Sequence, residues 1–361
     1  MNKRLNANDA GLVLMLAILF MYLIPTIVAT ILTLCGVDSE GAIYDWITTA
    51  SSSIAILLAV FVVGKGKEDF RPKEVFNLNT VLNQPSLFVR IIYVIGICIS
   101  LVIFSSTILS YLTAGLVELG FDTGIVSYPD VQGGYFMIGV IVLAVLPAIS
   151  EELLTRGVLL GSLKKGGYIY GILMSGLLFA IMHGNPLQLI HQFLLGAIFG
   201  YLVVISNSIL PAILGHFFNN FMSVFLMSIM PSEMLNQPDP TLAQLLEKDM
   251  LIGNIVTMLI FGGILIMLIV GYTNLMLSIK NDKVIRDTIS QGGDVKQLNL
   301  IHSIKGVGVA KVCEYLDESP LDHSDRDIVN RRMGKWLYVA IGIIVALWIV
   351  TTLVGFGVIS T

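Results

Sequence analysis

Long apolar stretches alternate with short polar loops along almost the whole chain. A helix needs roughly 20 consecutive apolar residues to cross the hydrocarbon core of a bilayer. Stretches close to or above this length occupy residues 10–34, 46–64, 87–117, 135–163, 168–184, 188–205, 209–230, 250–279 and 336–358. This pattern predicts an all-α fold, namely a polytopic transmembrane helical bundle with about nine spans.

The composition of the chain is also that of a membrane protein. Hydrophobic residues make up 55% of the 361 residues and charged residues only 13%, whereas soluble domains are about 25% charged. The first apolar stretch is too long for a signal peptide and lacks a small-residue cleavage site, so we expect a retained membrane anchor. The net charge of −4 comes without a long run of one sign, which argues against a nucleic-acid partner.

The positive charges indicate how the chain crosses the membrane. If the helices alternate from a cytoplasmic N-terminus, the inner segments hold 18 of the 21 lysine and arginine residues. Cytoplasmic segments collect these residues, and the outer loops carry mainly Asp and Glu instead. We therefore expect an integral protein of a bacterial plasma membrane, with its N-terminus in the cytoplasm and its C-terminus outside.

Three charged residues lie within the fourth apolar stretch, where each costs about 2.5 to more than 10 kcal/mol unless it has a partner or a purpose. Glu152 and Arg156 are four residues apart, so a helix places them on one face as a side-chain pair. Glu151 is rotated about 100° from Glu152 and is free for another role. The simpler alternative is a structural ion pair among all three residues that locks two helices together.

Two histidines are flanked almost wholly by apolar residues. His183 lies near the end of the fifth stretch, and His216 lies near the start of the seventh. Asn220 follows His216 by four residues and therefore shares its helix face, whereas Asn219 has the wrong phase. Taken singly, each histidine is more often a hydrogen-bonded core residue than a functional one.

The other histidines are weaker candidates. His191 lies in the sixth stretch, but the nearby pair Gly196-x-x-x-Gly200 favours a helix-packing role for that face. His302 and His323 fall in the polar segment before the last stretch, and we expect both to be solvated.

Depth along the helices tests whether the candidates can meet. At 1.5 Å per residue, Glu151 lies roughly 20 Å and His183 roughly 22 Å from the inner ends of their helices. His216 lies only about 10 Å from the start of its helix. A tilted or re-entrant seventh segment beginning near Pro211 would remove this mismatch.

Three motifs follow one another in separate apolar stretches. They read E-E-x-x-x-R from Glu151 to Arg156, F-x-x-x-H from Phe179 to His183 and H-x-x-x-N from His216 to Asn220. In this order the chain resembles the CAAX-protease and bacteriocin-processing (CPBP, Abi-like) family of intramembrane proteases, which includes the type II CAAX prenyl endopeptidases. The resemblance covers about residues 135–230, the four core helices of the family.

The resemblance implies an intramembrane endopeptidase that hydrolyses a peptide bond of a membrane-associated protein or peptide. It gives Glu151 the role of base on a water molecule that His183 also orients, and gives His216 and Asn220 the role of binding the carbonyl oxygen. A carboxylate in an apolar cavity can take a proton from water, and donors in a water-poor site stabilise an oxyanion strongly. The implied supporting residues are Glu152, Arg156 and Phe179.

The need for a metal is left open by these residues. Glu151, His183 and His216 could supply three zinc ligands and leave a fourth position for water. The H-E-x-x-H helix of soluble zinc proteases is absent from the sequence, and descriptions of the family differ on metal use. We expect no obligatory cofactor, and zinc is the one candidate.

Two other functions compete with a protease. One is a non-catalytic membrane immunity or partner-binding protein on the same scaffold, although all seven motif positions are filled. The other is a proton-coupled transporter, but the chain lacks the paired, interrupted segments of inverted repeats. The substrate stays open between a prenylated CAAX peptide, a bacteriocin leader peptide and a membrane-protein fragment, as does the oligomeric state.

The apolar stretches and the resemblance divide the chain into five regions. These are N-terminal transmembrane helices at 1–134, a CAAX-protease-like catalytic core at 135–230, an outer loop and eighth span at 231–279, a polar cytoplasmic segment at 280–335 and a final span at 336–361. Within the polar segment, residues 298–316 are apolar enough to lie along the membrane surface. The role of this segment is open.

Overall fold

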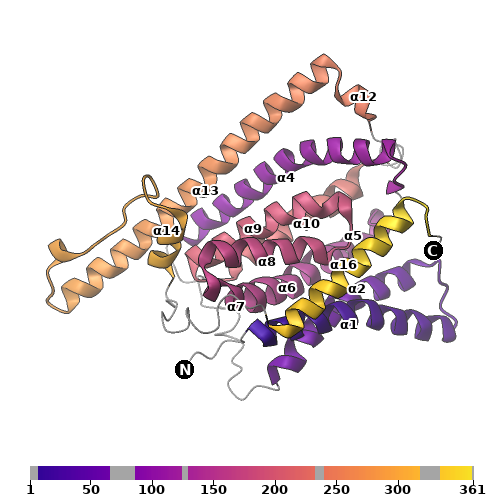
Figure 1. Cartoon of the computed structure of the whole chain (residues 1–361), viewed down its shortest axis with the longest axis horizontal. Helices are drawn as coiled ribbons and strands as arrows, with labels where there is room; N and C mark the ends of the chain where they lie inside the picture. Colours follow the sequence, from indigo (N-terminus) through magenta and orange to yellow (C-terminus); the bar gives the residue numbers. More distant parts are fainter. Residues whose placement is uncertain (1–6, 66–85, 124–128, 232–239, 318–333, 360–361) are drawn as a thin grey trace.

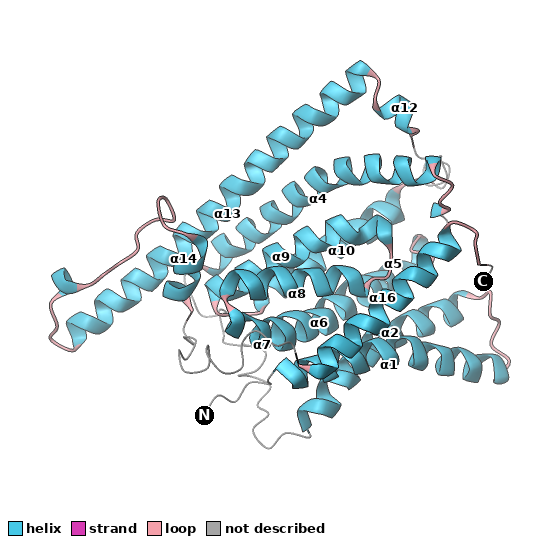
Figure 2. Ribbon diagram, viewed as in Figure 1, coloured by secondary structure: helices cyan, strands magenta, loops and turns pink. Residues whose placement is uncertain are grey.

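The computed structural model describes residues 7–65, 86–123, 129–231, 240–317 and 334–359, and within these ranges the chain forms helices and loops without a strand (Figure 2). The long helices are α1 (Ala7–Leu34), α2 (Ala42–Lys65), α4 (Leu87–Glu118), α8 (Tyr168–Met182), α9 (Leu189–Ser206), α10 (Leu210–Ile229), α13 (Lys248–Ser290) and α16 (Lys335–Gly355). Between α4 and α8 runs a composite helix of η3 (Gly133–Tyr135), α5 (Phe136–Gly139), η4 (Val140–Val145), α6 (Leu146–Glu152), η5 (Leu153–Leu160), α7 (Gly161–Leu163) and η6 (Lys164–Gly166). The short elements η7 (Pro186–Gln188), α12 (Leu242–Leu245), η8 (Val295–Gln297) and α14 (Val309–Leu316) complete the described parts.

Each of the nine predicted apolar stretches coincides with one of these helical segments. Eight of them, within the described ranges, are long and apolar enough to span a membrane. The fifth, α8, is apolar but has only 15 residues. The segments run back and forth across the molecule, so α1 begins and α16 ends at opposite ends (Figure 1). The prediction of a polytopic helical bundle is confirmed, and the chain is an integral membrane protein.

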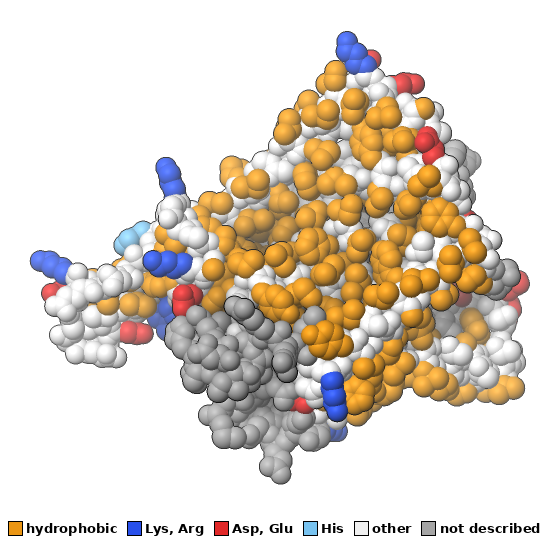
Figure 3. All heavy atoms as spheres, in the orientation of Figure 1, with side chains coloured by type: hydrophobic (Ala, Val, Ile, Leu, Met, Phe, Trp, Pro, Cys, Tyr) orange, Lys and Arg blue, Asp and Glu red, His pale blue; other side chains and the backbone are white. Residues whose placement is uncertain are grey.

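The outer surface agrees with this assignment. Apolar side chains cover the broad middle of the face in Figure 3, while charged side chains gather at its ends and edges. Leu259, Ile266 and Met267 of α13 are each more than 60% exposed. Such large exposed apolar surface is unfavourable in water and suits a lipid environment.

The composite helix departs from regular α geometry on both sides of α6. Pro147 has no N–H, so it leaves the carbonyl of Leu143 without its helical donor. The Asn220 side chain of α10 supplies that donor, with Nδ2 3.2 Å from the Leu143 oxygen. The π-helical runs η4 and η5 flank α6, and Glu151 and Glu152 end α6 just before η5 begins. Single π turns of this kind are frequent at functional sites.

Small residues let α8 and α9 approach closely, as the sequence predicts. A Cβ atom added to Gly196 would lie 2.8 Å from the Cα of Gly176, so neither position has room for a side chain. At Gly200 the nearest atom would be the Ser175 hydroxyl oxygen at 3.6 Å, an ordinary contact. The close approach therefore depends on Gly196 more than on Gly200.

The polar segment after the eighth span is partly helical. Helix α13 continues to Ser290, and α14 buries Val312, Cys313 and Leu316 against the protein's own helices, while its predicted position along the membrane surface stays a prediction. The Asp317 carboxylate accepts hydrogen bonds from Lys164 Nζ at 2.5 Å and from the Tyr168 hydroxyl at 3.2 Å. The predicted cytoplasmic residues Lys3, Arg4, Lys67, Arg71, Lys73 and His323 lie outside the described residues.

Candidate active site

Glu151, His183 and His216 converge at the centre of the bundle. The Glu151 Oε2 atom lies 3.8 Å from His183 Nε2 and 3.9 Å from His216 Nε2. Glu151 belongs to α6, His183 follows the last residue of α8, and His216 lies in α10. Three helical segments thus contribute one side chain each to a single cluster.

The two neighbouring carboxylates differ in access. The side chains of Glu151 and His183 are 16% and 19% exposed, whereas those of Glu152 and Arg156 are 0% exposed. The Oε2 atom of Glu151 is itself buried and has no hydrogen-bond partner. The Glu151 side chain is thus partly exposed although its Oε2 atom is not, while the side chains of Glu152 and Arg156 are fully buried.

The carboxylate of Glu152 joins two other charged or titratable groups. Its Oε1 atom lies 2.9 Å from Arg156 Nη1 and 2.9 Å from His216 Nδ1. The ion pair predicted from the spacing of Glu152 and Arg156 is therefore present. Arg156 also donates through Nη2 to the Gly196 carbonyl at 3.1 Å, and through Nη1 to the Thr155 hydroxyl.

The partners of the two imidazoles determine which ring nitrogen faces Glu151 as an acceptor. His183 Nδ1 lies 2.8 Å from the Phe179 carbonyl, which can only accept, so this nitrogen carries a proton. His216 Nδ1 likewise donates to the Glu152 carboxylate. In the neutral form of either ring, Nε2 then presents a lone pair toward Glu151.

Aromatic rings fill the space between these polar groups. Phe179 packs edge-on against His183 and His216, with ring centroids 4.8 and 5.7 Å apart. The Arg156 guanidinium lies 4.7 Å from the centroid of the Phe179 ring and 5.8 Å from that of Phe199. The aromatic face therefore stabilises the buried cation and restricts both imidazoles.

Asn220 has a partner that its motif does not reveal. Its Nδ2 atom donates to the Leu143 carbonyl, and its Oδ1 atom accepts a hydrogen bond from Asn219 Nδ2 at 3.1 Å. Asn219, which the sequence analysis set aside on helical phase, is buried and donates to Asn220. His191 contacts Ser105 of α4 with 2.7 Å between Nδ1 and Oγ, which agrees with the predicted helix-packing role.

The predicted depth mismatch of His216 has a structural explanation. The turn between α9 and α10 is buried at Ser208 and Ile209 rather than lying at the surface. Asn207, in this turn, donates to the Leu316 carbonyl at 2.6 Å, so α14 covers it. The start of α10 is recessed into the molecule, and His216 reaches Glu151 although it is close to the helix start.

The fit of a metal was tested on the three proposed donors. No group of three or more His, Cys, Asp and Glu side chains in the described ranges has an arrangement that could hold a metal ion. Glu151 approaches both Nε2 atoms, but the predicted zinc candidates Glu151, His183 and His216 do not form such a group. These three side chains therefore do not fit a zinc site.

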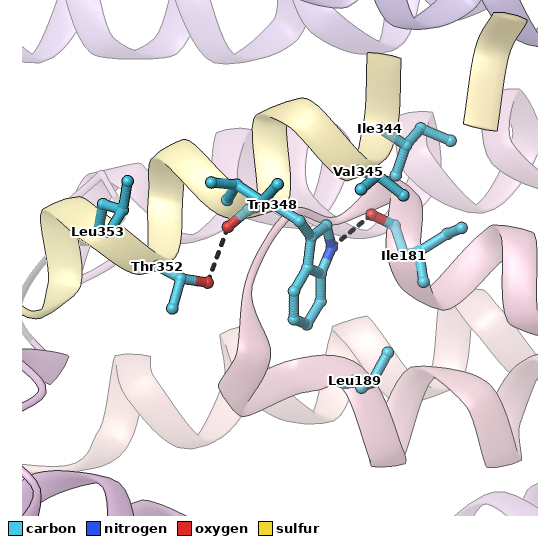
Figure 4. A pocket seen from close by; sticks show the side chains of 8 residues that line it. Ile181, Leu189, Ile344, Val345, Trp348, Thr352 and Leu353 are labelled. Carbon is cyan, nitrogen blue, oxygen red and sulfur yellow. Dashed lines mark hydrogen bonds between the residues drawn. The ribbon is translucent and has the colours of Figure 1, made fainter. Parts of the chain in front are cut away.

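An apolar pocket opens between α16, the end of α8 and the start of α9 (Figure 4). Its volume is about 480 Å³, and its lining is almost wholly apolar. Trp348 lies in the pocket wall and donates from Nε1 to the Ile181 carbonyl at 2.8 Å. Ile181 and Leu189 lie on either side of the turn that carries His183, but Glu151, His183 and His216 are not among the residues that line the pocket.

Some contacting residues escaped the sequence analysis because their types are common in helices. Thr155 donates to the Glu151 carbonyl at 2.6 Å and accepts from Arg156, which ties the three polar positions together. Only its position between Glu151 and Arg156 could have indicated this role from the sequence. Ser105 offered none, since a serine in an apolar helix commonly bonds to the preceding turn.

The fold and this cluster define a class, a polytopic helical membrane protein with acidic and imidazole side chains gathered between its helices. Residues 133–222 match the family described as Type II CAAX prenyl endopeptidase Rce1-like. The match agrees with the family that the three motifs indicated, and all seven motif positions lie inside it. The match supports a protease in general terms and a membrane-associated peptide as its substrate. Comparisons with curated proteins and with solved structures gave no match.

Proposed function

We propose that the chain is an intramembrane endopeptidase in which a water molecule activated by Glu151 hydrolyses a peptide bond of a membrane-associated protein or peptide. The observation that carries the proposal is the convergence of Glu151 Oε2 on two imidazole Nε2 atoms, at 3.8 and 3.9 Å, inside the family-matched helices. A structural ion pair would not need two such rings facing a partly accessible carboxylate.

The proposed reaction requires a water molecule between these atoms. Distances of 3.8 and 3.9 Å are too long for direct hydrogen bonds, and polar groups at such separations are commonly bridged by water. One water proton goes to Glu151 and the other is held by the Nε2 lone pair of neutral His183. The water oxygen is then free to attack the carbonyl carbon.

The resulting oxyanion requires hydrogen-bond donors, and we assign one of them to His216. In the proposed reaction His216 carries a proton on each ring nitrogen when the oxyanion forms. Glu152 already accepts from His216 Nδ1, so the protonated ring directs its Nε2–H toward the carbonyl oxygen. Asn220 supplies a second donor.

Collapse of the tetrahedral intermediate completes the reaction. The bond between carbon and nitrogen breaks, and the proton taken up by Glu151 passes to the leaving amine. The new carboxyl group carries the oxygen of the water molecule. The products are two peptides, and the enzyme returns to its starting protonation state.

The proposal is tested by comparing membrane peptides from cells that produce either the native chain or Glu151→Gln. This substitution keeps the size of the side chain and removes its basicity. We expect one or more intact peptides to accumulate in the variant, while the His302→Leu control, altered at an exposed histidine, resembles the native chain. Identical peptide pools from the native chain and the variant would exclude proteolysis by Glu151 and favour a binding scaffold.

A further inference from the structure

A tight turn at the end of α8 carries His183. Helix α8 ends at Met182, and Gly184 has a φ of 64°, a conformation that favours glycine. The Gly184 N–H donates to the Ile181 carbonyl at 3.1 Å, and His183 lies within the turn that this hydrogen bond closes. The position of the His183 ring therefore depends on the backbone of the last turn of α8.

The Ile181 carbonyl accepts a second hydrogen bond, from a side chain of α16. Trp348 Nε1 lies 2.8 Å from this oxygen, and Figure 4 shows the indole nitrogen directed from α16 toward the end of α8. A carbonyl oxygen has two lone pairs and an indole nitrogen can only donate, so both hydrogen bonds can form together. The pocket wall around Trp348 is almost wholly apolar, and a hydrogen bond is stronger in such surroundings than in water. This bond thus ties α16 to the turn that carries His183.

The His183 ring links this turn to the reactive carboxylate. Its Nδ1 atom donates to the Phe179 carbonyl at 2.8 Å, one turn earlier in α8, and its Nε2 atom lies 3.8 Å from Glu151 Oε2. The hydrogen bond to Phe179 fixes the ring to the backbone of α8. A displacement of the last turn of α8 would therefore move Nε2 relative to Glu151.

Helix α16 also borders the turn at a second residue. A Cβ atom added to Gly184 would lie 4.0 Å from the Thr351 hydroxyl oxygen of α16 and 3.7 Å from the Tyr22 hydroxyl oxygen of α1. Helices α1 and α16 pack against each other as well. The turn of His183 is thus bordered by two helices that lie outside the family-matched residues 133–222.

We propose that Trp348 is a positioning residue, which holds His183 in place beside Glu151 through its hydrogen bond to the Ile181 carbonyl. His183 is the residue assigned to orient the attacking water, so the part of Trp348 in cleavage rests on the proposed function. The effect of Trp348 on the His183 ring is a property of the free protein and is testable without a substrate.

The first test observes the His183 ring directly. The protein is labelled with ¹⁵N-histidine in lipid nanodiscs, and the His183 imidazole signals are assigned by their loss in His183→Ala. Trp348→Phe keeps an aromatic ring in the pocket wall but removes the donor, and we expect it to shift the His183 signals. Trp336→Phe, the same substitution near the start of α16, is the matched control and leaves them in place. Unchanged His183 signals in Trp348→Phe, or an equal shift in both variants, would overturn the proposal.

The second test separates positioning of His183 from binding of a substrate in the pocket that Trp348 also lines. With the peptide identified through Glu151→Gln, we expect Trp348→Phe to lower kcat about tenfold with little change in KM, because a displaced water-orienting group slows the chemical step. In the His183→Ala background the same substitution causes no further loss of kcat. A raised KM with native kcat, or an equal loss of kcat in both backgrounds, would overturn the positioning role. If the native chain cleaves no peptide, the proposed function fails, while the His183 signals still decide whether Trp348 positions the ring.

Discussion

Glu151 and Glu152 are neighbours in the sequence, yet their carboxylates have different surroundings. Glu152 is fully buried and bonded to Arg156 and His216. Glu151 is partly accessible and faces two imidazole nitrogens without a hydrogen bond to its Oε2 atom. These surroundings support the proposal of separate roles, in which Glu152 holds the neighbouring helices together and Glu151 is the reactive residue.

Removing the charge of Glu152 is expected to destabilise the fold. Glu152→Gln leaves the Arg156 guanidinium buried without its counter-charge, and breaking such a pair costs about 3 to 5 kcal/mol. The midpoint of thermal unfolding in detergent should fall clearly below that of the native chain. Glu118→Gln, at an exposed position near the end of α4, should leave the midpoint unchanged. Equal midpoints for Glu152→Gln and the native chain would contradict a structural role for the pair.

The motif residues could be predicted from the sequence, because charged and imidazole side chains are costly in an apolar helix and must find partners. The spacing of Glu152 and Arg156 gave their ion pair directly. The hydrogen bond from Asn219 to Asn220 could not be predicted, because hydropathy does not show how two neighbouring amides orient. The hydrogen bond from Asn220 to the Leu143 carbonyl depends on the helix irregularity at Pro147, which hydropathy does not reveal.

At the scale of elements, α16 lies outside the family-matched residues but forms one wall of the apolar pocket. The pocket adjoins the turn that carries His183. We propose that it receives the apolar part of the substrate. An apolar lining with few polar groups is typical of sites that bind such ligands.

Filling the pocket tests this role of α16. Val345→Trp places a large side chain in the pocket lining, and we expect KM for the apolar peptide to rise severalfold. Val350→Trp is the matched control, since Val350 is also exposed on α16 but does not line the pocket. Kinetics of the purified variants give the answer. A similar KM for both variants would contradict substrate binding in this pocket.

Hydropathy predicted where the helices lie along the chain, but it did not predict where each helix ends. The apolar stretches gave the nine helical segments, because a bilayer requires long runs of apolar residues. The end of α13 at Ser290 could not be read from the sequence, because a helix can continue beyond the membrane with polar residues. The recessed start of α10 depends on α14, which is distant in sequence and covers the turn.

At the scale of the whole molecule, α14 closes the end of the bundle at which α8 begins. Its buried side includes Cys313, and the Asp317 contacts with Lys164 and Tyr168 attach its C-terminal end. Burial, together with the negative charge of Asp317, raises the pKa of the Cys313 thiol to about 12. The thiolate is the reactive form, so Cys313 reactivity should appear only as the pH approaches that value.

Maleimide labelling at pH 8 tests both the closure and the proposed orientation. Cys35 is exposed and precedes the loop that the sequence predicts to be the first outer one, so an impermeant reagent should label it in intact cells. Cys313 should stay unlabelled even after permeabilisation, and Asp317→Asn should make it reactive by weakening the attachment of α14. Labelling of native Cys313 as fast as Cys35 in permeabilised cells would contradict the closure. Failure to label Cys35 from outside would contradict the orientation.

The central claim is that Glu151 performs the chemistry while the surrounding helices hold it in place. The most direct measurement is the cleavage rate of the identified peptide by purified Glu151→Gln in lipid vesicles, alongside its thermal midpoint. We predict a rate at least about 100-fold below that of the native chain, as expected for loss of a general base, with an unchanged midpoint. Cleavage by Glu151→Gln at the native rate would contradict the claim.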